Sequence, residues 1–128
     1  MTANQELRPR GVAYLTQMFG DGAAEALISD MDGLCPDFAE MSIEWALGGI
    51  ACRPGLDPVV RELVVIASCV TLGHPVTQLR AHTQAALRAG ATREQIIEAI
   101  LQLMFYAGGA AVRNALVAVK DILNGSAT

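Results

Sequence analysis

Glycine and proline residues divide this sequence into stretches that are each about one helix long, and this spacing limits the fold more than any other feature. Within the stretches Ala, Leu and Glu outnumber aromatic residues, and no long alternation of apolar and polar residues indicates a strand. We therefore predict an all-α protein with six or seven helices. The expected helices cover approximately residues 9–19, 22–31, 36–47, 58–72, 76–89, 93–107 and 111–123.

Several helix ends carry capping residues. Asp57 precedes a proline, which is the usual order for an N-cap followed by the first helical residue. Thr92 and Gln95 have the spacing of a capping box, and Gly90 has the position of a C-terminal stop. Asp21 is the expected N-cap of the second helix. The capping pattern supports the helix boundaries given above.

The predicted helix over residues 58–72 is apolar around almost its whole circumference. A helix of this kind is buried on all sides. Glu62, Ile66 and Cys69 are spaced so that they share one face of it. The helix over residues 93–107 is also almost entirely apolar, so we expect these two helices to form the core, covered by the other helices or by another subunit.

Length and charge narrow the class of protein. The chain has 128 residues, which fits a single domain over residues 1–128. The 9 basic and 13 acidic residues give a net charge of -4, which argues against nucleic acid or an anionic membrane surface as the main partner. Only 17% of the residues are charged and the mean hydropathy is +0.36, so we expect leftover apolar surface that is buried in a homo-oligomer.

Three features predict a protein of the reducing cytoplasm. No stretch is apolar over the roughly 18 to 20 residues that a membrane span requires. The N-terminal residues 1–10 are not followed by the apolar segment of a secretion signal. Cys35, Cys52 and Cys69 are odd in number and lack CxxC spacing, so we expect neither a disulfide framework nor a zinc site, and we expect Cys69 to be a buried structural thiol.

His82 and Glu62 are the candidate catalytic residues. His82 has small and apolar neighbours at helical spacing, so it is either a core histidine bonded to a backbone carbonyl or a general acid/base. Glu62 is either a carboxylate that caps the first turn of its helix or a partner that orients a histidine or relays its proton. Residue type and spacing leave both alternatives open.

Four further residues are candidates for substrate binding. Arg53 lies in a turn, where an arginine is either solvated or directed into a cleft to bind a carboxylate through two hydrogen bonds. Arg61 is the weaker candidate for the same role. Trp45 and Tyr106 are either core residues or pocket-lining residues with a polar group to offer.

Four segments of the chain together resemble the carboxymuconolactone decarboxylase family, within the alkylhydroperoxidase D-like superfamily. They are Trp45 to Leu56 (WALGGIACRPGL), Arg61 to Gly73 (RELVVIASCVTLG), Gln78 to Gly90 (QLRAHTQAALRAG) and Thr92 to Leu116 (TREQIIEAILQLMFYAGGAAVRNAL). The family-like core covers about residues 38–123. The resemblance implies an all-α subunit with the alkylhydroperoxidase D-like fold that assembles as a homotrimer or a homohexamer.

The peroxidase branch of the superfamily has a different pattern of reactive residues. That pattern is a Glu near a helix start, then CxxC, then a His one helical turn later. Glu62 and His82 match its ends, but the two cysteine positions fall on Pro75 and Gln78. A thiol peroxidase requires an attacking and a resolving thiol. The sequence therefore disfavours peroxidase activity.

The resemblance implies a lyase that needs no metal and no organic cofactor. The family reaction converts 4-carboxymuconolactone into the enol-lactone of 3-oxoadipate with loss of carbon dioxide, a step of aromatic compound catabolism. The substrate is its own electron sink. The resemblance implies that His82 donates the proton and that Glu62 orients His82 or shuttles the proton. It also implies that Arg53 or Arg61 anchors a substrate carboxylate. Trp45 and Tyr106 would line the pocket.

Two alternatives remain from the sequence. The first is a divergent family member that acts on another lactone or a biosynthetic intermediate. The second is a catalytically quiet binding module. In each case we expect a small anionic or lactone ligand as the partner.

Overall fold

The computed structural model describes residues 3–125, and side chains from residue 6 onward. Every regular element in these residues is a helix, which confirms the predicted all-α class. None of the described helices is long and apolar enough to cross a membrane. The contacts group the chain into two compact units, Met1–Leu56 and Asp57–Thr128, and each is described by itself. The single domain expected over the whole chain stays a prediction.

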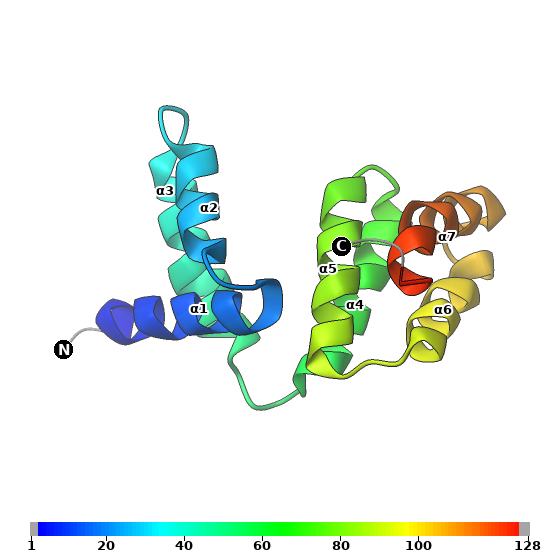
Figure 1. Cartoon of the computed structure of the whole chain (residues 1–128), viewed down its shortest axis with the longest axis horizontal. Coiled ribbons are helices and arrows are strands. Elements are labelled where there is room, and N and C mark those ends of the chain that lie inside the picture. Colours follow the sequence, from blue (N-terminus) through cyan, green and yellow to red (C-terminus); the bar gives the residue numbers. More distant parts are fainter. Residues whose placement is uncertain (1–2, 126–128) are drawn as a thin grey trace. The chain divides into compact units, whose positions relative to one another are not determined.

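The first unit consists of α1 (Ala3–Phe19), α2 (Ala23–Met31), α3 (Pro36–Met41) and the π-helix η1 (Ser42–Ala51) (Figure 1). Its core contains Leu15, Ala24 and Ile43. The closest packing is between α1 and η1, where two glycines bring the backbones together. A Cβ on Gly11 would lie 1.9 Å from the carbonyl oxygen of Ile43, and one on Gly48 would lie 2.0 Å from that of Leu7. No side chain fits at either position.

Three boundaries in the first unit differ from the predictions. The first helix begins at Ala3 rather than at Pro9, because the helix-favouring residues before Pro9 extend it. The second helix is preceded by Gly22, whose φ of 80° makes the turn, so Asp21 is not its N-cap. The predicted break at Gly48 is absent, because η1 continues to Ala51 through the close contact with α1.

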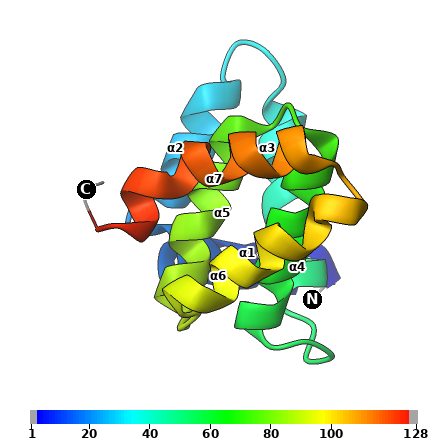
Figure 2. The same ribbon diagram turned by 90° about the vertical axis from the view of Figure 1, so that its right-hand side faces the viewer.

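The second unit consists of α4 (Pro58–Leu72), α5 (Val76–Ala89), α6 (Arg93–Leu101), the 3₁₀-helix η2 (Gln102–Phe105) and α7 (Gly109–Leu123). Helices α4 and α5 form an antiparallel pair, against which α6 and α7 pack (Figures 1 and 2). The core is built mainly from aliphatic side chains of all four α-helices. Its largest fully buried members are Ile66, Val70, Ile96, Ile100, Val112 and Val119.

The local capping predictions hold in the second unit. The Asp57 side chain accepts a hydrogen bond from the Val60 backbone amide at 3.1 Å, so Asp57 is the N-cap of α4. Thr92 and Gln95 form both hydrogen bonds of the capping box. Gly90 ends α5 with a φ of 110°. These short-range interactions depend only on neighbouring residues, which is why the sequence alone locates them.

The second unit by itself buries only one side of α4, so the covering of its other side by another subunit stays a prediction. Glu62, Ile66, Cys69 and Val70 are buried, but Val64 is 58% exposed and Leu72 is 61% exposed. The other helices of this small unit cover one side of α4 only. Hydropathy around a helix therefore does not tell which element covers each face.

The sixth helix is shorter than predicted. It ends at Leu101 and continues as η2 to Phe105, instead of running as one helix to Ala107. The carbonyl of Leu103 accepts hydrogen bonds from the backbone amides of both Tyr106 and Ala107, which tightens the last turn. Phe105 and Tyr106 are consequently 93% and 84% exposed in this unit.

Candidate functional site

The structure brings Glu62 and His82 into direct contact within the second unit. Glu62 Oε2 lies 2.6 Å from His82 Nδ1. Glu62 is only 2% exposed, whereas the His82 side chain is 19% exposed. The pair is thus a buried carboxylate that holds a histidine with limited access to solvent.

The antiparallel pairing of α4 and α5 explains this contact. Glu62 lies on the buried face of α4 that also carries Ile66 and Cys69, as its spacing predicted. His82 lies on α5, beyond the Gly73–Pro75 connection, and the two helices pack against each other. The hairpin therefore brings together residues that are 20 positions apart.

The contact bears on the alternatives that the sequence leaves for these two residues, although their catalytic roles stay predictions. Glu62 lies beyond the first turn of α4, which Asp57 caps, so Glu62 is not the capping carboxylate. His82 has the Glu62 carboxylate as a partner at Nδ1, so it differs from a core histidine held by a backbone carbonyl alone. The geometry is compatible with the prediction that Glu62 orients His82.

The hydrogen bond constrains the protonation of the imidazole. An ionised carboxylate only accepts hydrogen bonds, so Nδ1 donates to Glu62 and carries a proton. A histidine can exchange a proton with a substrate or with solvent through either ring nitrogen, and Nε2 is the one that does not face Glu62 in this contact. The arrangement suits a histidine that gives and regains a proton at Nε2.

Cys69 shares the buried face of α4 with Glu62 and is 8% exposed. Burial raises the pKa of its thiol, and the negative charge of Glu62 raises it further. Both causes favour the protonated thiol over the thiolate, which is the nucleophilic form. The predicted burial of Cys69 is therefore confirmed.

The other predicted site residues are distributed over both units. Arg61 precedes Glu62 on α4 and is half-buried. Tyr106 follows η2 and is 84% exposed. Arg53 and Trp45 belong to the first unit, where Arg53 is exposed and Trp45 is 56% exposed. Their binding roles stay predictions.

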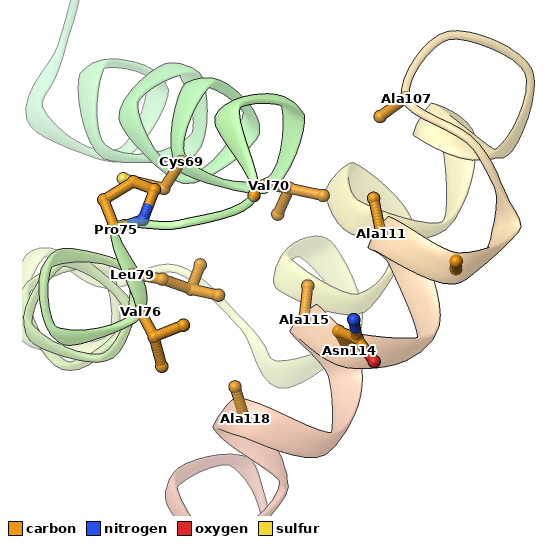
Figure 3. A pocket seen from close by; sticks show the side chains of 12 residues that line it. Cys69, Val70, Pro75, Val76, Leu79, Ala107, Ala111, Asn114, Ala115 and Ala118 are labelled. Atoms are coloured by element: carbon orange, nitrogen blue, oxygen red, sulfur yellow. The ribbon is translucent and has the colours of Figure 1, made fainter.

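A cavity of about 370 Å³ in the second unit was not predicted from the sequence (Figure 3). Its walls come from the end of α4, the following connection, the start of α5, and α7 with the residue Ala107 before it. Five of its lining residues are alanines. The recurrence of alanine along α7 is visible in the sequence. A cavity also depends on which side chains of other helices face these alanines, and the sequence does not show that.

The six predicted site residues are absent from the lining of this cavity. Cys69 and Leu79 line it, and they lie on the same two helices as Glu62 and His82. Among the described residues, no group of three or more His, Cys, Asp and Glu side chains is placed to hold a metal ion.

The described features define a small helical protein in which a helical hairpin holds a buried carboxylate–histidine pair. The chain belongs to the carboxymuconolactone decarboxylase family, whose sequence profile matches residues 36–121. The matched region contains both members of the pair and all four predicted substrate-binding residues.

Curated proteins related to this chain include two decarboxylases. It is 29% identical to a 4-carboxymuconolactone decarboxylase of Acinetobacter baylyi over 120 residues, which cover 93% of this chain and 89% of the relative. It is 27% identical to a nitrosuccinic acid decarboxylase of Metarhizium robertsii over 126 residues, which cover 94% and 87%. It is also 32% identical, over 72% of this chain and 69% of the relative, to an uncharacterized 15.0 kDa protein of Paracoccus denitrificans.

Proposed function

We propose that this chain is a cofactor-free decarboxylase that acts on a small carboxylated lactone or a related acid. The observation that carries the proposal is the 2.6 Å contact between His82 Nδ1 and the buried Glu62 carboxylate. It provides an oriented proton donor, which decarboxylation through a stabilised anion requires. Membership of the family and the two relatives named as decarboxylases support this reaction type.

The names of the two related decarboxylases suggest a common chemical requirement for the substrate. In 4-carboxymuconolactone, the departing carboxylate is conjugated through the ring with the lactone carbonyl. In nitrosuccinic acid, one carboxylate and the nitro group are attached to the same carbon atom. Both compounds are substituted succinic acids in which an electron-withdrawing group can accept the electron pair that carbon dioxide leaves behind. We extend this substrate class to the present chain.

The proposed reaction breaks one carbon–carbon bond and forms one carbon–hydrogen bond. The electron pair of the breaking carbon–carbon bond moves into the lactone or nitro group as carbon dioxide leaves. The imidazolium of His82 then donates its Nε2 proton to carbon, and solvent restores that proton. Glu62 keeps Nδ1 protonated and offsets the positive charge of the ring.

A cation is needed for the carboxylate that stays on the substrate. Arg53 is our first candidate and Arg61 the second, because a guanidinium binds a carboxylate through two parallel hydrogen bonds. Arg61 lies next to Glu62 on α4, and its Nε atom is buried. Trp45 and Tyr106, which are both largely exposed in their own units, are proposed to line the substrate pocket.

We also propose that the chain functions as a homotrimer or a homohexamer. Val64 and Leu72 on α4, together with Phe105 after α6, expose apolar surface in the second unit. Isolated apolar residues are common on protein surfaces, but several on one small unit favour an interface.

Thiol peroxidase activity is disfavoured by the residues at the expected positions. Pro75 and Gln78 occupy them, and the nearby Cys69 is buried with a raised thiol pKa. We expect no consumption of peroxide with a dithiol donor.

The relative named for nitrosuccinic acid supports a different alternative, in which family members act on acids that are not lactones.

The test is to incubate the purified chain with 4-carboxymuconolactone and, separately, with nitrosuccinate, and to measure released carbon dioxide. We expect release from at least one of them, with a rate lowered about 10²-fold or more in Glu62→Gln. The matched control is Glu98→Gln, a change at an exposed glutamate on α6, which should leave the rate unchanged. A folded protein that releases carbon dioxide from neither compound contradicts the proposal.

A further inference from the structure

Arg80 joins helix α5 to the C-terminal half of helix α7. Its Nη1 atom donates hydrogen bonds to the Ala118 carbonyl oxygen at 2.6 Å and to Asp121 Oδ1 at 2.7 Å. Its Nη2 atom donates a hydrogen bond to Asp121 Oδ2 at 2.9 Å. The guanidinium therefore binds the carboxylate through two parallel hydrogen bonds and the main chain of α7 through a third. This arrangement fixes the orientation of the guanidinium as well as its position.

Arg80 and His82 hold α5 from opposite sides. They are two residues apart, and each helical residue is turned by about 100° from the one before it, so their side chains leave different faces of α5. His82 contacts Glu62 on α4, and Arg80 contacts Asp121 on α7. Because α4 also packs against α7, a shift of α5 on α7 changes where the imidazole lies relative to Glu62.

The first half of α5 meets small side chains on α7. The cavity of about 370 Å³ lies beside Val76 and Leu79 of α5, and the α7 side chains opposite them include Ala111, Ala115 and Ala118 (Figure 3). Alanine side chains end at Cβ, so they interlock less with a neighbouring helix than larger side chains do. The three hydrogen bonds of Arg80 therefore carry much of what fixes this part of α5 on α7.

We propose that Arg80 is a positioning residue that, through Asp121 and the Ala118 carbonyl, sets where the His82 imidazole lies relative to Glu62. The catalytic consequence rests on the function proposed above, whereas the placement of the imidazole does not. Both side chains of the ion pair are about two-fifths exposed, so the pair adds little to the free energy of unfolding. Its effect on position is larger in its consequence, because a misplacement of about 1 Å can cost about 10²-fold in rate.

Nitrogen-15 NMR of the imidazole measures the placement without any substrate. In the unaltered chain we expect a His82 Nδ1 proton that the hydrogen bond to Glu62 protects from exchange with solvent. In Arg80→Met this proton should exchange at least about tenfold faster, because the contact opens more often. Arg88→Met makes the same change at an exposed position in the last turn of α5 and should leave the exchange unchanged. Equal exchange in Arg80→Met and the unaltered chain, or no protected Nδ1 proton in the unaltered chain, overturns the proposal.

A double variant tests whether Arg80 acts through Asp121. Asp121→Ala should also speed the exchange of the His82 Nδ1 proton, because it removes two of the three hydrogen bonds of Arg80. The protein with both Arg80→Met and Asp121→Ala should match Arg80→Met within about twofold, since residues that act as a unit do not have additive effects. Two effects that multiply in the double variant contradict the shared action.

Steady-state kinetics tests the catalytic consequence. On the compound that the unaltered chain decarboxylates, Arg80→Met should lower kcat roughly tenfold to a hundredfold at a nearly constant KM, because Arg80 acts through His82. A variant with fast Nδ1 exchange and an unaltered kcat overturns this consequence. If the unaltered chain releases carbon dioxide from neither compound, the proposed function fails, and the exchange rates still decide whether Arg80 positions His82.

Discussion

Glu62 Oε2 and His82 Nδ1 lie 2.6 Å apart, with the carboxylate buried and the imidazole partly open to solvent. This difference in burial gives each residue a distinct capacity. The buried carboxylate is placed to orient the ring, and the partly exposed ring is the member more open to solvent. We therefore propose that His82 donates the proton and that Glu62 positions His82.

Glu62→Gln tests the contribution of the carboxylate charge. Glutamine has almost the same shape, but it carries no carboxylate to accept a charge-assisted hydrogen bond from Nδ1. We expect kcat to fall about 10²-fold while KM stays nearly constant, because Glu62 acts through His82 and not on the bound substrate. Steady-state kinetics of decarboxylation measures this split. A rise in KM at constant kcat would assign Glu62 to substrate binding instead.

Arg53→Ala tests the carboxylate anchor. Loss of a charged hydrogen-bonding partner is worth about 1.5–3 kcal/mol, so KM should rise roughly tenfold to a hundredfold. The same change at Arg61 should have the smaller effect. Arg88→Ala, at an exposed position in the last turn of α5, is the control. If Arg53→Ala and Arg88→Ala have the same KM, then Arg53 is not the anchor.

The ion pair between Arg80 and Asp121 links α5 to α7 and predicts a pH dependence of stability. Hydrogen bonds of 2.7 and 2.9 Å from Arg80 hold the pKa of the Asp121 carboxyl below its usual range. A carboxyl with a lowered folded-state pKa stabilises the fold above its unfolded pKa of about 3.9, and this contribution is lost as pH falls through the folded value. The effect is small, because both side chains are about two-fifths exposed.

Thermal unfolding of Asp121→Asn alongside the unaltered chain checks this sign. The variant should have a slightly lower Tm near neutral pH, and the difference should shrink at pH values below about 3.9. A difference in Tm that grows as the solution becomes more acidic would contradict the assignment.

Gly48→Ala and Gly49→Ala form a matched pair on η1. A Cβ on Gly48 would meet the Leu7 carbonyl oxygen at 2.0 Å, whereas the nearest atom to a Cβ on Gly49 is at 3.5 Å. We expect Gly48→Ala to lower the free energy of unfolding by about 1–3 kcal/mol or more. Gly49→Ala should be neutral or stabilising, because alanine favours a helix over glycine by about 1 kcal/mol. Urea unfolding of both variants measures the contrast, and equal midpoints would contradict the close packing of α1 and η1.

The sequence predicts best those structural features that depend only on residues close together in the chain. The N-cap at Asp57 and the capping box at Thr92 depend on contacts within a single turn, and the structure confirms both. The buried face of α4 that carries Glu62 also follows from helical spacing. The contact of Glu62 with His82 does not follow from spacing, because it depends on how the hairpin aligns α4 with α5.

Packing between segments that are distant in the sequence explains the features that the sequence did not predict. Gly48 was expected to end a helix, but the helix continues because its missing side chain admits the backbone of α1. Val64 is 58% exposed in the second unit, and its burial by another subunit stays a prediction. The cavity likewise depends on which side chains face the alanines of α7. None of these contacts is encoded in a local pattern.

The most direct test of the account compares the two histidines of the chain. Carbon dioxide release should be measured for the unaltered protein, His82→Gln and His74→Gln, on whichever of 4-carboxymuconolactone and nitrosuccinate the unaltered protein decarboxylates. His74 is exposed in the connection between α4 and α5, so its replacement should leave the rate unchanged. We predict that His82→Gln is slower by about 10²-fold or more with an unchanged circular dichroism spectrum. A folded His82→Gln protein that works at the unaltered rate would contradict it.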